Sequence, residues 1–390
     1  MFFSFIYFLK GYKKYKIWYA KKHMKEKAEG IRNMNKKRLD YLDMTKGIGI
    51  ILVVIGHSTL AGESLLTWIA SFHMPLFFIV TGILLQHTQE ENTKLSVIIR
   101  KKTKSIMLPY LSFSIISLLM DAGMLILHKG NKTMLDFIYA IIGTFTCYGI
   151  STLWFLPALF LGEIGFLYIR KRYNHVITIL LGIILAFIIG ITHPIFDASY
   201  SLYATMYNVV FGYILIWLYR GGSAYIFITM GYYVKKYIVE KERIQVKEVA
   251  LGFIFLLTGA AFAFTNGRVD LHSVIFKNNI YFYISAFAGT MGVILISKNI
   301  KNLKPLQYAG KNSLIIMATH LDFRIMITAI RAAAFINASV IAIPVYLEYV
   351  IMTMVLLVLE CIVIYMMNHY FYIFIGKKKP LNRKRFRVLK

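Results

Sequence analysis

Long apolar stretches, separated by short polar or charged segments, recur along most of the chain. Each is about 17–25 residues long, the length that an α-helix needs to cross the hydrocarbon of a bilayer. Two further apolar pieces, 134–149 and 204–219, are shorter or interrupted and are expected to lie in the interface or to re-enter, which leaves eleven or twelve spans open. The pattern predicts an all-α integral membrane protein, a bundle of about ten transmembrane helices. The predicted spans are 47–66, 67–87, 105–127, 152–169, 176–193, 221–237, 247–265, 280–297, 311–330 and 345–367.

Composition supports this interpretation. Hydrophobic residues make up 58% of the 390 residues and charged residues only 16%, too little polar surface for a water-soluble chain of this size. The formal net charge of +27 could indicate nucleic-acid binding, but the basic residues form short clusters between apolar stretches rather than one soluble face. We therefore expect no nucleic-acid partner. The two cysteines, Cys147 and Cys361, offer no metal-ligand spacing, so no metal site is predicted.

Basic residues lie mostly on one predicted side of the membrane. With ten spans and a cytoplasmic amino terminus, 38 of the 45 Lys and Arg residues fall in cytoplasmic segments. The positive-inside bias produces this asymmetry, so both termini are predicted to be cytoplasmic and the location to be the cell membrane. We expect three parts: a basic cytoplasmic arm, 1–40, a transmembrane domain, 41–376, and a basic cytoplasmic tail, 377–390.

The first predicted span carries a cation and an imidazole on one helix face. Lys46 and His57 are eleven residues apart, close to three helical turns. Asp43 precedes Lys46 by three residues and can pair with it, and glycines such as Gly47 leave room for a close helix or a ligand. The pattern predicts a cation at the cytoplasmic mouth and an imidazole, near mid-membrane, able to act as a general base. The alternative is a lysine that snorkels to the interface and a histidine bonded to a neighbouring helix.

Other side chains at membrane depth are further candidates, because ionisable groups there are costly unless paired or facing a wet cavity. His73 opens the second predicted span, and His320 lies about nine residues into the ninth. Glu163 follows Trp154 by nine residues in the fourth. For each ionisable group the competing interpretation is a structural hydrogen bond or ion pair, and for Trp154 it is the interfacial aromatic belt.

A basic cluster precedes the third predicted span. Arg100, Lys101, Lys102 and Lys104 stand just before an apolar stretch, where positive-inside residues are expected. The functional alternative is a surface beside Lys46 that binds the phosphates of a donor entering from the cytoplasm.

Four segments, in matching order, resemble the membrane-bound acyltransferase-3 family. Short glycine and histidine patterns recur by chance, so the order of the four on successive spans carries the resemblance rather than any one of them. The resemblance extends from about residue 38 to residue 370. The segments are Leu42 to Ile48 with Gly56-His57-Ser58, Phe72 to Phe78 with Thr81-Gly82, Leu153 to Phe160, and Gly310 to Ser313 with His320.

The resemblance implies an O-acyltransferase with about ten spans. Such a protein moves an acyl group, commonly acetyl, from cytoplasmic acyl-CoA to a hydroxyl of an extracytoplasmic or membrane-carried glycan. Acyl-CoA is then a substrate, and no permanently bound cofactor is expected. The implied partners are acyl-CoA, a surface glycan or lipid-linked sugar, and the lipid bilayer.

The resemblance also suggests roles for residues. His57 corresponds to the essential histidine of the family, with Asp43 orienting Lys46. Lys46 stands where many members carry an arginine, and an ammonium cannot make the forked contact of a guanidinium.

The remaining roles are less closely matched by the family pattern. Arg100, Lys101 and Lys104 are expected to take the phosphate-binding role of a degenerate arginine pair. His73, His320, Glu163 and Trp154 are the candidates for holding the acceptor or an oxyanion.

Two other functions stay open at this stage. A proton-coupled transporter or flippase of a small or lipid-linked solute would use the histidines and carboxylates as a relay. The sequence shows no internal repeat, which weakens that alternative. A non-catalytic member serving small-molecule sensing is the third hypothesis. The sequence leaves open the acceptor, the acyl length, the oligomeric state, and whether His57 acts as a base or briefly carries the acyl group.

Overall fold

The computed structural model describes residues 38–58, 62–128, 132–200, 206–238, 245–300, 303–323, 325–339 and 345–378. Within these ranges the chain is helical, and β structure is limited to an isolated bridge between Asp270 and Ile275. The predicted all-α fold is therefore confirmed. Most of the predicted basic arm, 1–40, and basic tail, 377–390, lies outside the described residues.

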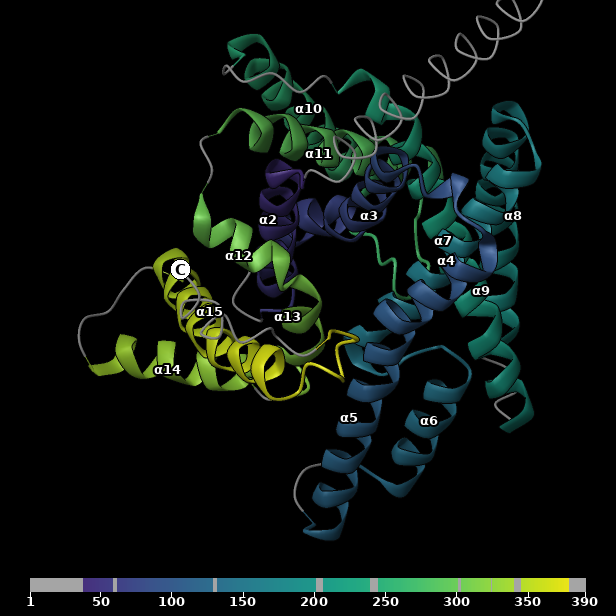
Figure 1. Cartoon of the computed structure of the whole chain (residues 1–390). Coiled ribbons are helices and arrows are strands. Elements are labelled where there is room, and N and C mark those ends of the chain that lie inside the picture. The colour runs from purple at the N-terminus through teal and green to yellow at the C-terminus, as the bar shows by residue number, and fades with distance from the viewer. Residues whose placement is uncertain are drawn as a thin grey trace, which may run out of the picture.

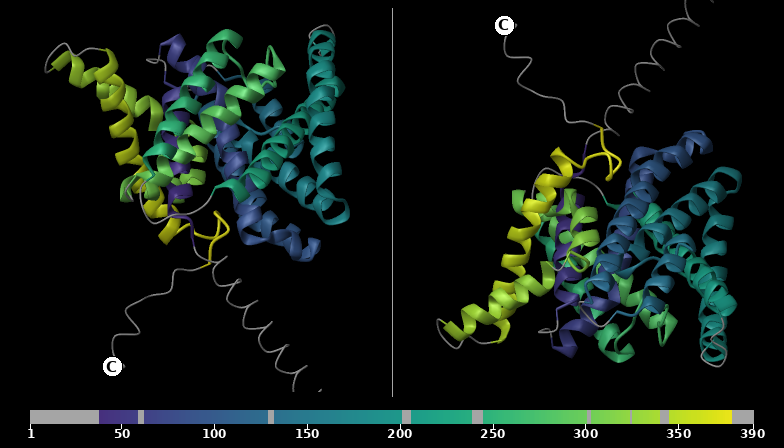
Figure 2. Two further views of the ribbon diagram at one scale, coloured as in Figure 1. Left: turned by 90° about the horizontal axis from the view of Figure 1, so that it is seen from above. Right: turned by 90° about the horizontal axis from the view of Figure 1, so that it is seen from below.

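The long helices run alongside one another, with α2 and α3 in the middle of the assembly (Figures 1 and 2). Eight segments of the described chain are long and apolar enough to cross a membrane: α3, α4–α5, η3–α7, α8, α9–η4, α10, α11 and α15. In order, the elements are α2 (Asp40–Gly56), α3 (Glu63–Thr88), η1 (Glu90–Asn92), α4 (Leu95–Lys102), η2 (Thr103–Met107), α5 (Leu108–Ile126), α6 (Met134–Phe145), η3 (Ser151–Trp154), α7 (Phe155–Arg172), α8 (His175–Tyr200), α9 (Met206–Val234), η4 (Lys235–Tyr237), α10 (Val246–Asn266), α11 (Asn279–Asn299), α12 (Lys304–Lys311), α13 (Ser313–Thr319), α14 (Ile325–Ser339) and α15 (Val345–His369).

The central helix α2 touches α12 backbone to backbone. A Cβ atom on Gly47 would overlap the carbonyl of Leu306, and one on Gly310 would overlap the carbonyl of Asp43. Gly47 therefore serves a close helix rather than a ligand, which resolves one of the sequence alternatives. This crossing fixes the start of α2, where Asp43 and Lys46 lie.

The first two spans begin earlier than the sequence predicted, and the first also ends earlier. The predicted ranges were 47–66 and 67–87, whereas α2 ends at Gly56 and α3 starts at Glu63. The charged segment before residue 47 is part of α2. Its charges do not end the helix, because Asp43 pairs with both Arg38 and Lys46.

Two predicted segments in the middle of the chain are one helix. The pieces 204–219 and 221–237 join in α9, although Arg220 stands at the junction. Arg220 is fully buried, and its guanidinium donates hydrogen bonds to the carbonyl oxygens of Tyr148 (2.6 Å) and His272 (2.7 Å). A satisfied charge can stay in a helix, which the apolar pattern alone cannot show.

The predicted ninth span, 311–330, is not continuous. The helix is interrupted at Asn312, between α12 and α13. The chain then turns at residues 320–323, and α14 follows. The other predicted short piece, 134–149, contains α6, whose twelve residues are too few to cross hydrocarbon.

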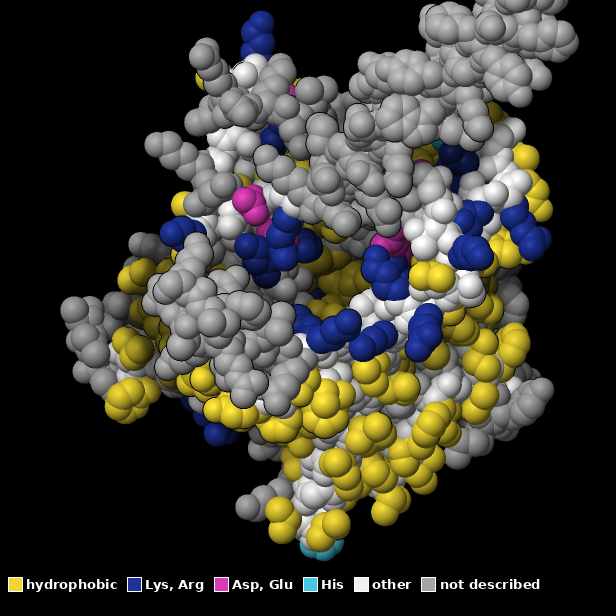
Figure 3. Space-filling model, viewed as in Figure 1, with side chains coloured by type: hydrophobic (Ala, Val, Ile, Leu, Met, Phe, Trp, Pro, Cys, Tyr) yellow, Lys and Arg dark blue, Asp and Glu magenta, His cyan; other side chains and the backbone are white. Residues whose placement is uncertain are grey.

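Segments with many Lys and Arg residues meet on one face. The Lys171 ammonium at the end of α7 donates to the carbonyl of Glu91 (2.6 Å), and Lys298 at the end of α11 pairs with Glu248 at the start of α10 (2.8 Å). Burial and the nearby Arg38 guanidinium lower the pKa of Lys377, so the two ends of the described chain lie close together. Figure 3 shows Lys and Arg side chains around a hollow on this face, between α2, α4 and α13 in the matching view of Figure 1.

Candidate functional site

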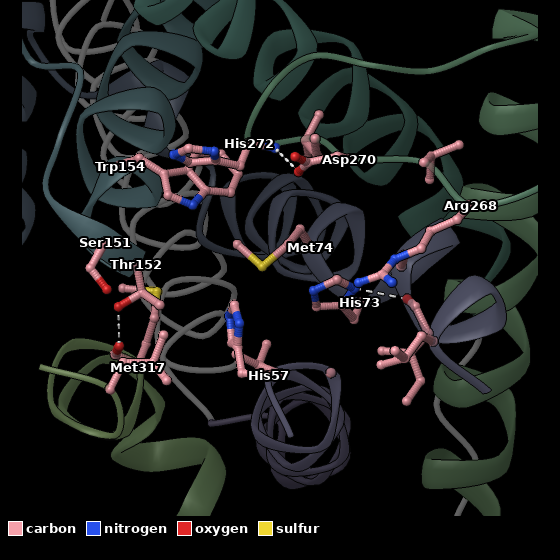
Figure 4. Close-up of a pocket in the computed structure, with 18 of the residues that line it drawn as sticks. His57, His73, Met74, Ser151, Thr152, Trp154, Arg268, Asp270, His272 and Met317 are labelled. Carbon is pink, nitrogen blue, oxygen red and sulfur yellow. Dashed lines mark hydrogen bonds between the residues drawn. The ribbon is translucent and has the colours of Figure 1, made fainter. Parts of the chain in front are cut away.

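A cavity of about 630 Å³ opens at the carboxyl end of α2, and we call it the histidine cavity. Its histidines come from three parts of the fold, namely α2, α3 and the loop that joins α10 to α11 (Figure 4). Apolar side chains cover much of the rest of its wall. Its polar and aromatic lining residues are His57, His73, Ser151, Thr152, Trp154, Arg268, Asp270 and His272.

His57 follows the last residue of α2, and its imidazole faces the cavity (Figure 4). Its backbone N–H is held by the carbonyls of Val53 and Val54, so the end of the helix fixes where the ring leaves the chain. The ring is exposed to the cavity rather than packed shut. An imidazole in this position can meet a second reactant that enters the cavity.

His73 lies inside α3, not at the start of a span as the sequence predicted, because α3 begins at Glu63. Its Nδ1 lies 2.8 Å from the carbonyl oxygen of Ile69, which can only accept, so Nδ1 carries the hydrogen. In the neutral ring Nε2 is then an acceptor. His73 therefore suits a hydroxyl donor better than an oxyanion.

His320 caps α13 and is fully buried against His57. The centroids of the two rings are 5.3 Å apart. The Nδ1 atom of His320 donates to the carbonyl of Ile316 (2.8 Å), which leaves Nε2 as an acceptor in the neutral ring. Among the described residues, this Nε2 atom has no hydrogen-bond partner.

The cavity roof is a loop that sequence reasoning missed. Residues 267–278 join α10 to α11 and bring Arg268, Asp270 and His272 to the cavity. Arg220 holds the loop through the carbonyl of His272, and its guanidinium lies 5.1 Å from the ring centroid of Trp154. The loop mixes polar residues with buried apolar ones such as Leu271 and Phe276, so only a feature such as the buried arginine in α9 could have pointed to it.

Burial, followed by the nearby Arg220 guanidinium, lowers the pKa of His272 in this loop to about 4. The imidazole is therefore neutral at physiological pH. A neutral ring beside Trp154, 5.7 Å between centroids, gives the cavity an uncharged aromatic corner.

A second cavity, of about 540 Å³, lies toward the amino-terminal half of α2, and we call it the lysine cavity. Its charged lining residues are Lys46, Glu90, Lys102 and Glu163, above a largely apolar wall from α2, α3, α7 and α13. The elements that line it surround the hollow seen in Figure 3.

Lys46 and Asp43 form the predicted pair, with 2.9 Å between the ammonium nitrogen and a carboxylate oxygen. Arg38, which the sequence did not single out, pairs with the same carboxylate. Asp43 is thus buried between two cations and holds Lys46 at the edge of the lysine cavity.

Lys102 is the member of the basic cluster that lines the lysine cavity. It pairs with Glu163, which is buried, and with Glu90 at 3.1 Å. The side chains of Arg100, Lys101 and Lys104 are exposed outside the lining, although Lys101 also pairs with Glu90. A π-helical turn, Thr103–Met107, follows Lys102 directly, and such turns are often found at functional sites.

The two carboxylates that pair with Lys102 were not expected in this cavity. Glu163, a candidate for the acceptor side, lies in the lysine cavity rather than with His57. Glu90 belongs to η1, outside the spanning helices, and was not a candidate. Burial by itself raises the pKa of the Glu90 carboxyl. The ammonium groups of Lys102 and Lys101 together lower this pKa by more than burial raises it, so it lies below its usual value.

Lys46 and His57 therefore line two different cavities at the two ends of α2. Among the lining residues of the two cavities, Met317 of α13 is the one common to both. The structure brings His57, His73, His320 and Trp154 together at one end, and Lys46, Lys102, Glu163 and Asp43 at the other.

A comparison with protein families assigns the chain to a family. The family model Acyl_transf_3, described as an acyltransferase domain, matches residues 39–366. The chain belongs to the acyltransferase-3 family. No curated protein and no solved structure matches it. The matched range includes all the residues that line the two cavities.

Proposed function

We propose that this acyltransferase-3 protein moves an acyl group, in the simplest case acetyl, from acyl-CoA in the lysine cavity to a hydroxyl of a glycan in the histidine cavity. The observation that carries the proposal is the pair of cavities at opposite ends of α2, one lined by lysines and the other by histidines, with Met317 between them. A transfer between reactants from opposite sides of a membrane needs such a pair.

In the proposed orientation the basic face is cytoplasmic in the cell membrane, with both termini on that side. The positive-inside bias supports this, and so does the closeness of Arg38 to Lys377. Ten crossings result if α2 and the broken α13–α14 segment are added to the eight long segments. The histidine cavity then faces away from the cytoplasm, where glycans of the cell envelope are available.

For the donor, Lys46 and Lys102 supply cations to the phosphates of CoA, and the pantetheine arm follows the apolar wall of the lysine cavity. Arg100, Lys101 and Lys104 attract the nucleotide from the exposed rim. Because Lys46 is an ammonium, this contact is a single point charge rather than a bidentate grip.

For the chemistry, His57 removes the proton of the acceptor hydroxyl as its oxygen attacks the thioester carbonyl. The C–O bond of the ester forms and the C–S bond breaks. The proton passes from the imidazolium to the CoA thiolate, so the products are a glycan ester and CoA thiol. His73 accepts a hydrogen bond from a second hydroxyl, and Trp154 offers an apolar face to the sugar ring.

His320 acts through His57 in this proposal. Its Nε2 has no partner in the described part of the structure, and the two ring centroids are 5.3 Å apart. In the proposed mechanism a rotation of the His57 ring brings its N–H to this Nε2, which fixes the tautomer and leaves the other nitrogen free as the base. This is the arrangement of a base oriented by a third group.

The test is transfer of label from [acetyl-¹⁴C]acetyl-CoA to envelope glycans in membranes that contain the protein. His57→Ala should lower transfer by roughly 10²–10⁴-fold, because it removes the general base. The matched control is His175→Ala, since His175 lies at the start of α8 against Tyr233, far from both cavity linings. Full transfer by the His57→Ala protein would refute the catalytic role, and proton-coupled flux without ester formation would favour a carrier.

A further inference from the structure

The wall between the two cavities is one helical turn thick. On α2, and again on α3, a residue that lines the histidine cavity is three positions away from a residue that lines the lysine cavity. Where η3 passes into α7, a residue that lines the histidine cavity is followed directly by one that lines the lysine cavity. Residues three apart on a helix are neighbours on one face, so each such pair has one member on either side of the same wall. The pairs, with the histidine-cavity member first, are Val53 and Ile50, Met74 and Phe77, and Trp154 and Phe155.

Met317 completes this wall and contributes to the lining of both cavities. It belongs to α13, a helix of seven residues between two breaks of the chain. Its backbone carbonyl accepts a hydrogen bond from the Thr152 hydroxyl (2.6 Å), which anchors α13 to the start of α7 (Figure 4). The bond holds the main chain, and the thioether side chain, which makes no hydrogen bond with the described residues, is held only by apolar packing.

Met74 is also a methionine, but it lines only the histidine cavity, and the wall residues on the side of the lysine cavity are less able to move. Phe77 and Phe155 lie edge to face with 5.9 Å between ring centroids, and Phe155 also stacks on Phe78 at 4.7 Å. Ile50 and Val53 are branched and almost fully buried. Methionine is unbranched and has three rotatable side-chain bonds, so it changes conformation at the lowest cost.

We propose that the Met317 side chain is the movable partition between the donor thioester and His57, and that it restricts the acyl group to a short chain. The proposal rests on the proposed function, in which the acyl carbon must pass from the lysine cavity to the imidazole. An acetyl group needs only the space that one displaced thioether leaves. A longer acyl chain has to occupy the packed wall of Ile50, Phe77 and Phe155 as well, and interiors at this density have no spare volume.

The first experiment measures the partition without any acyl transfer. Cys147 and Cys361 are replaced by alanine, and Ser151→Cys places one thiol in the histidine cavity. Inverted membrane vesicles present the basic face to a charged, membrane-impermeant methanethiosulfonate. Met317→Ala should raise the labelling rate about tenfold, because it removes the side chain that closes the wall. Met352→Ala is the matched control: Met352 is fully buried in α15 and lines neither cavity.

Two further variants guard against a folding artefact. Met317→Leu keeps the volume and should label as slowly as the parent, whereas Met317→Phe should label more slowly. Equal labelling rates in the parent and the Met317→Ala protein would overturn the partition. Fast labelling of the parent from the basic face would overturn it too.

The second experiment measures acyl length with acetyl-CoA and butyryl-CoA. Two extra methylenes in an apolar pocket change discrimination on the order of tenfold or more, so Met317→Ala should raise the butyryl-to-acetyl ratio by about that factor. An unchanged ratio would refute the restriction on chain length. If no variant, including the parent, transfers any acyl group, the proposed function fails while the labelling rates still decide whether Met317 separates the cavities.

Discussion

The imidazole rings of His57 and His320 lie 5.3 Å apart between centroids, although His57 follows α2 near the start of the described chain and His320 follows α13 near its end. One ring faces the histidine cavity and the other is fully buried behind it. The buried ring is locked by its Nδ1 hydrogen bond to Ile316 and presents a bare Nε2 to the interior. The pair is thus asymmetric: the His57 ring is open to the cavity, and in the proposed function the buried His320 ring orients His57.

Two substitutions at His320 separate orientation from packing. Asparagine can keep the bond to the Ile316 carbonyl but has no group at the position of Nε2, whereas glutamine places an acceptor there. We expect His320→Asn to lower kcat about a hundredfold with an unchanged KM for acyl-CoA, and His320→Gln to restore part of the loss. Steady-state kinetics across pH 5–9 provide the measurement. Equal activity of the two variants would show that His320 only fills space.

Lys102 should be required for stability through its two carboxylate partners. Lys102→Met leaves Glu163 buried without a cation, which costs about 3–5 kcal/mol in comparable buried pairs. The double variant Lys102→Met with Glu163→Gln removes both charges and should recover most of that loss. Thermal unfolding of the purified protein in detergent measures both effects. A single variant as stable as the parent would mean that Glu163 does not depend on Lys102.

The role of Lys102 in donor binding can be measured separately from its role in stability. Lys102→Arg retains the charge and should keep the KM for acyl-CoA within a few-fold, whereas the stable double variant should raise it on the order of tenfold. Lys101→Met is the matched control, because Lys101 pairs with Glu90 but lies outside the cavity lining. A KM that rises equally in the control would place the phosphates on the rim instead.

Much of the fold followed from the sequence because each long apolar helix carries its own hydropathy pattern. α10, α11 and α15 begin and end within two residues of the predicted spans. The pattern was wrong where tertiary contacts decide. Arg220 is tolerated inside α9 because Tyr148 and His272 supply carbonyls from distant segments. The ninth predicted span is interrupted at Asn312 and at residues 320–323, positions that include polar residues but that the overall apolar pattern did not reveal.

The candidate site was partly predictable for a similar reason. The spacing of Asp43, Lys46 and His57 is local, and the pair between Asp43 and Lys46 is present in the structure. That Lys46 and His57 line separate cavities is not local, because the wall between them is built by α3, α7 and α13. The sequence likewise could not distinguish Lys102 from its basic neighbours, because its ion pair with Glu163 depends on the packing of distant segments.

The crossing of α2 and α12 should tolerate no added methyl group. A Cβ atom at position 310 would overlap the carbonyl of Asp43, so Gly310→Ala must push the helices apart and move the Asp43–Lys46 pair. We expect a loss of about 1–3 kcal/mol in stability together with a raised KM for acyl-CoA. Gly123→Ala in α5 is the control, because nothing lies within 4 Å of the added atom and alanine favours a helix. A melting temperature unchanged by Gly310→Ala would contradict the close crossing.

Acid should loosen the roof of the histidine cavity before it affects the rest of the fold. His272 has a pKa of about 4 in the folded chain, against an ordinary value of 6.5, because burial and then Arg220 oppose its protonation. The unfolded loop binds a proton more readily than the folded loop. The stability that neutral His272 contributes to the folded loop is therefore fully present above pH 6.5 and is lost as the pH falls toward about 4. Limited proteolysis of the loop 267–278, at pH values from 7 to 4.5, should show cleavage rising on acidification. His272→Gln should make cleavage independent of pH, and a parent loop equally resistant at both ends of the range would refute the prediction.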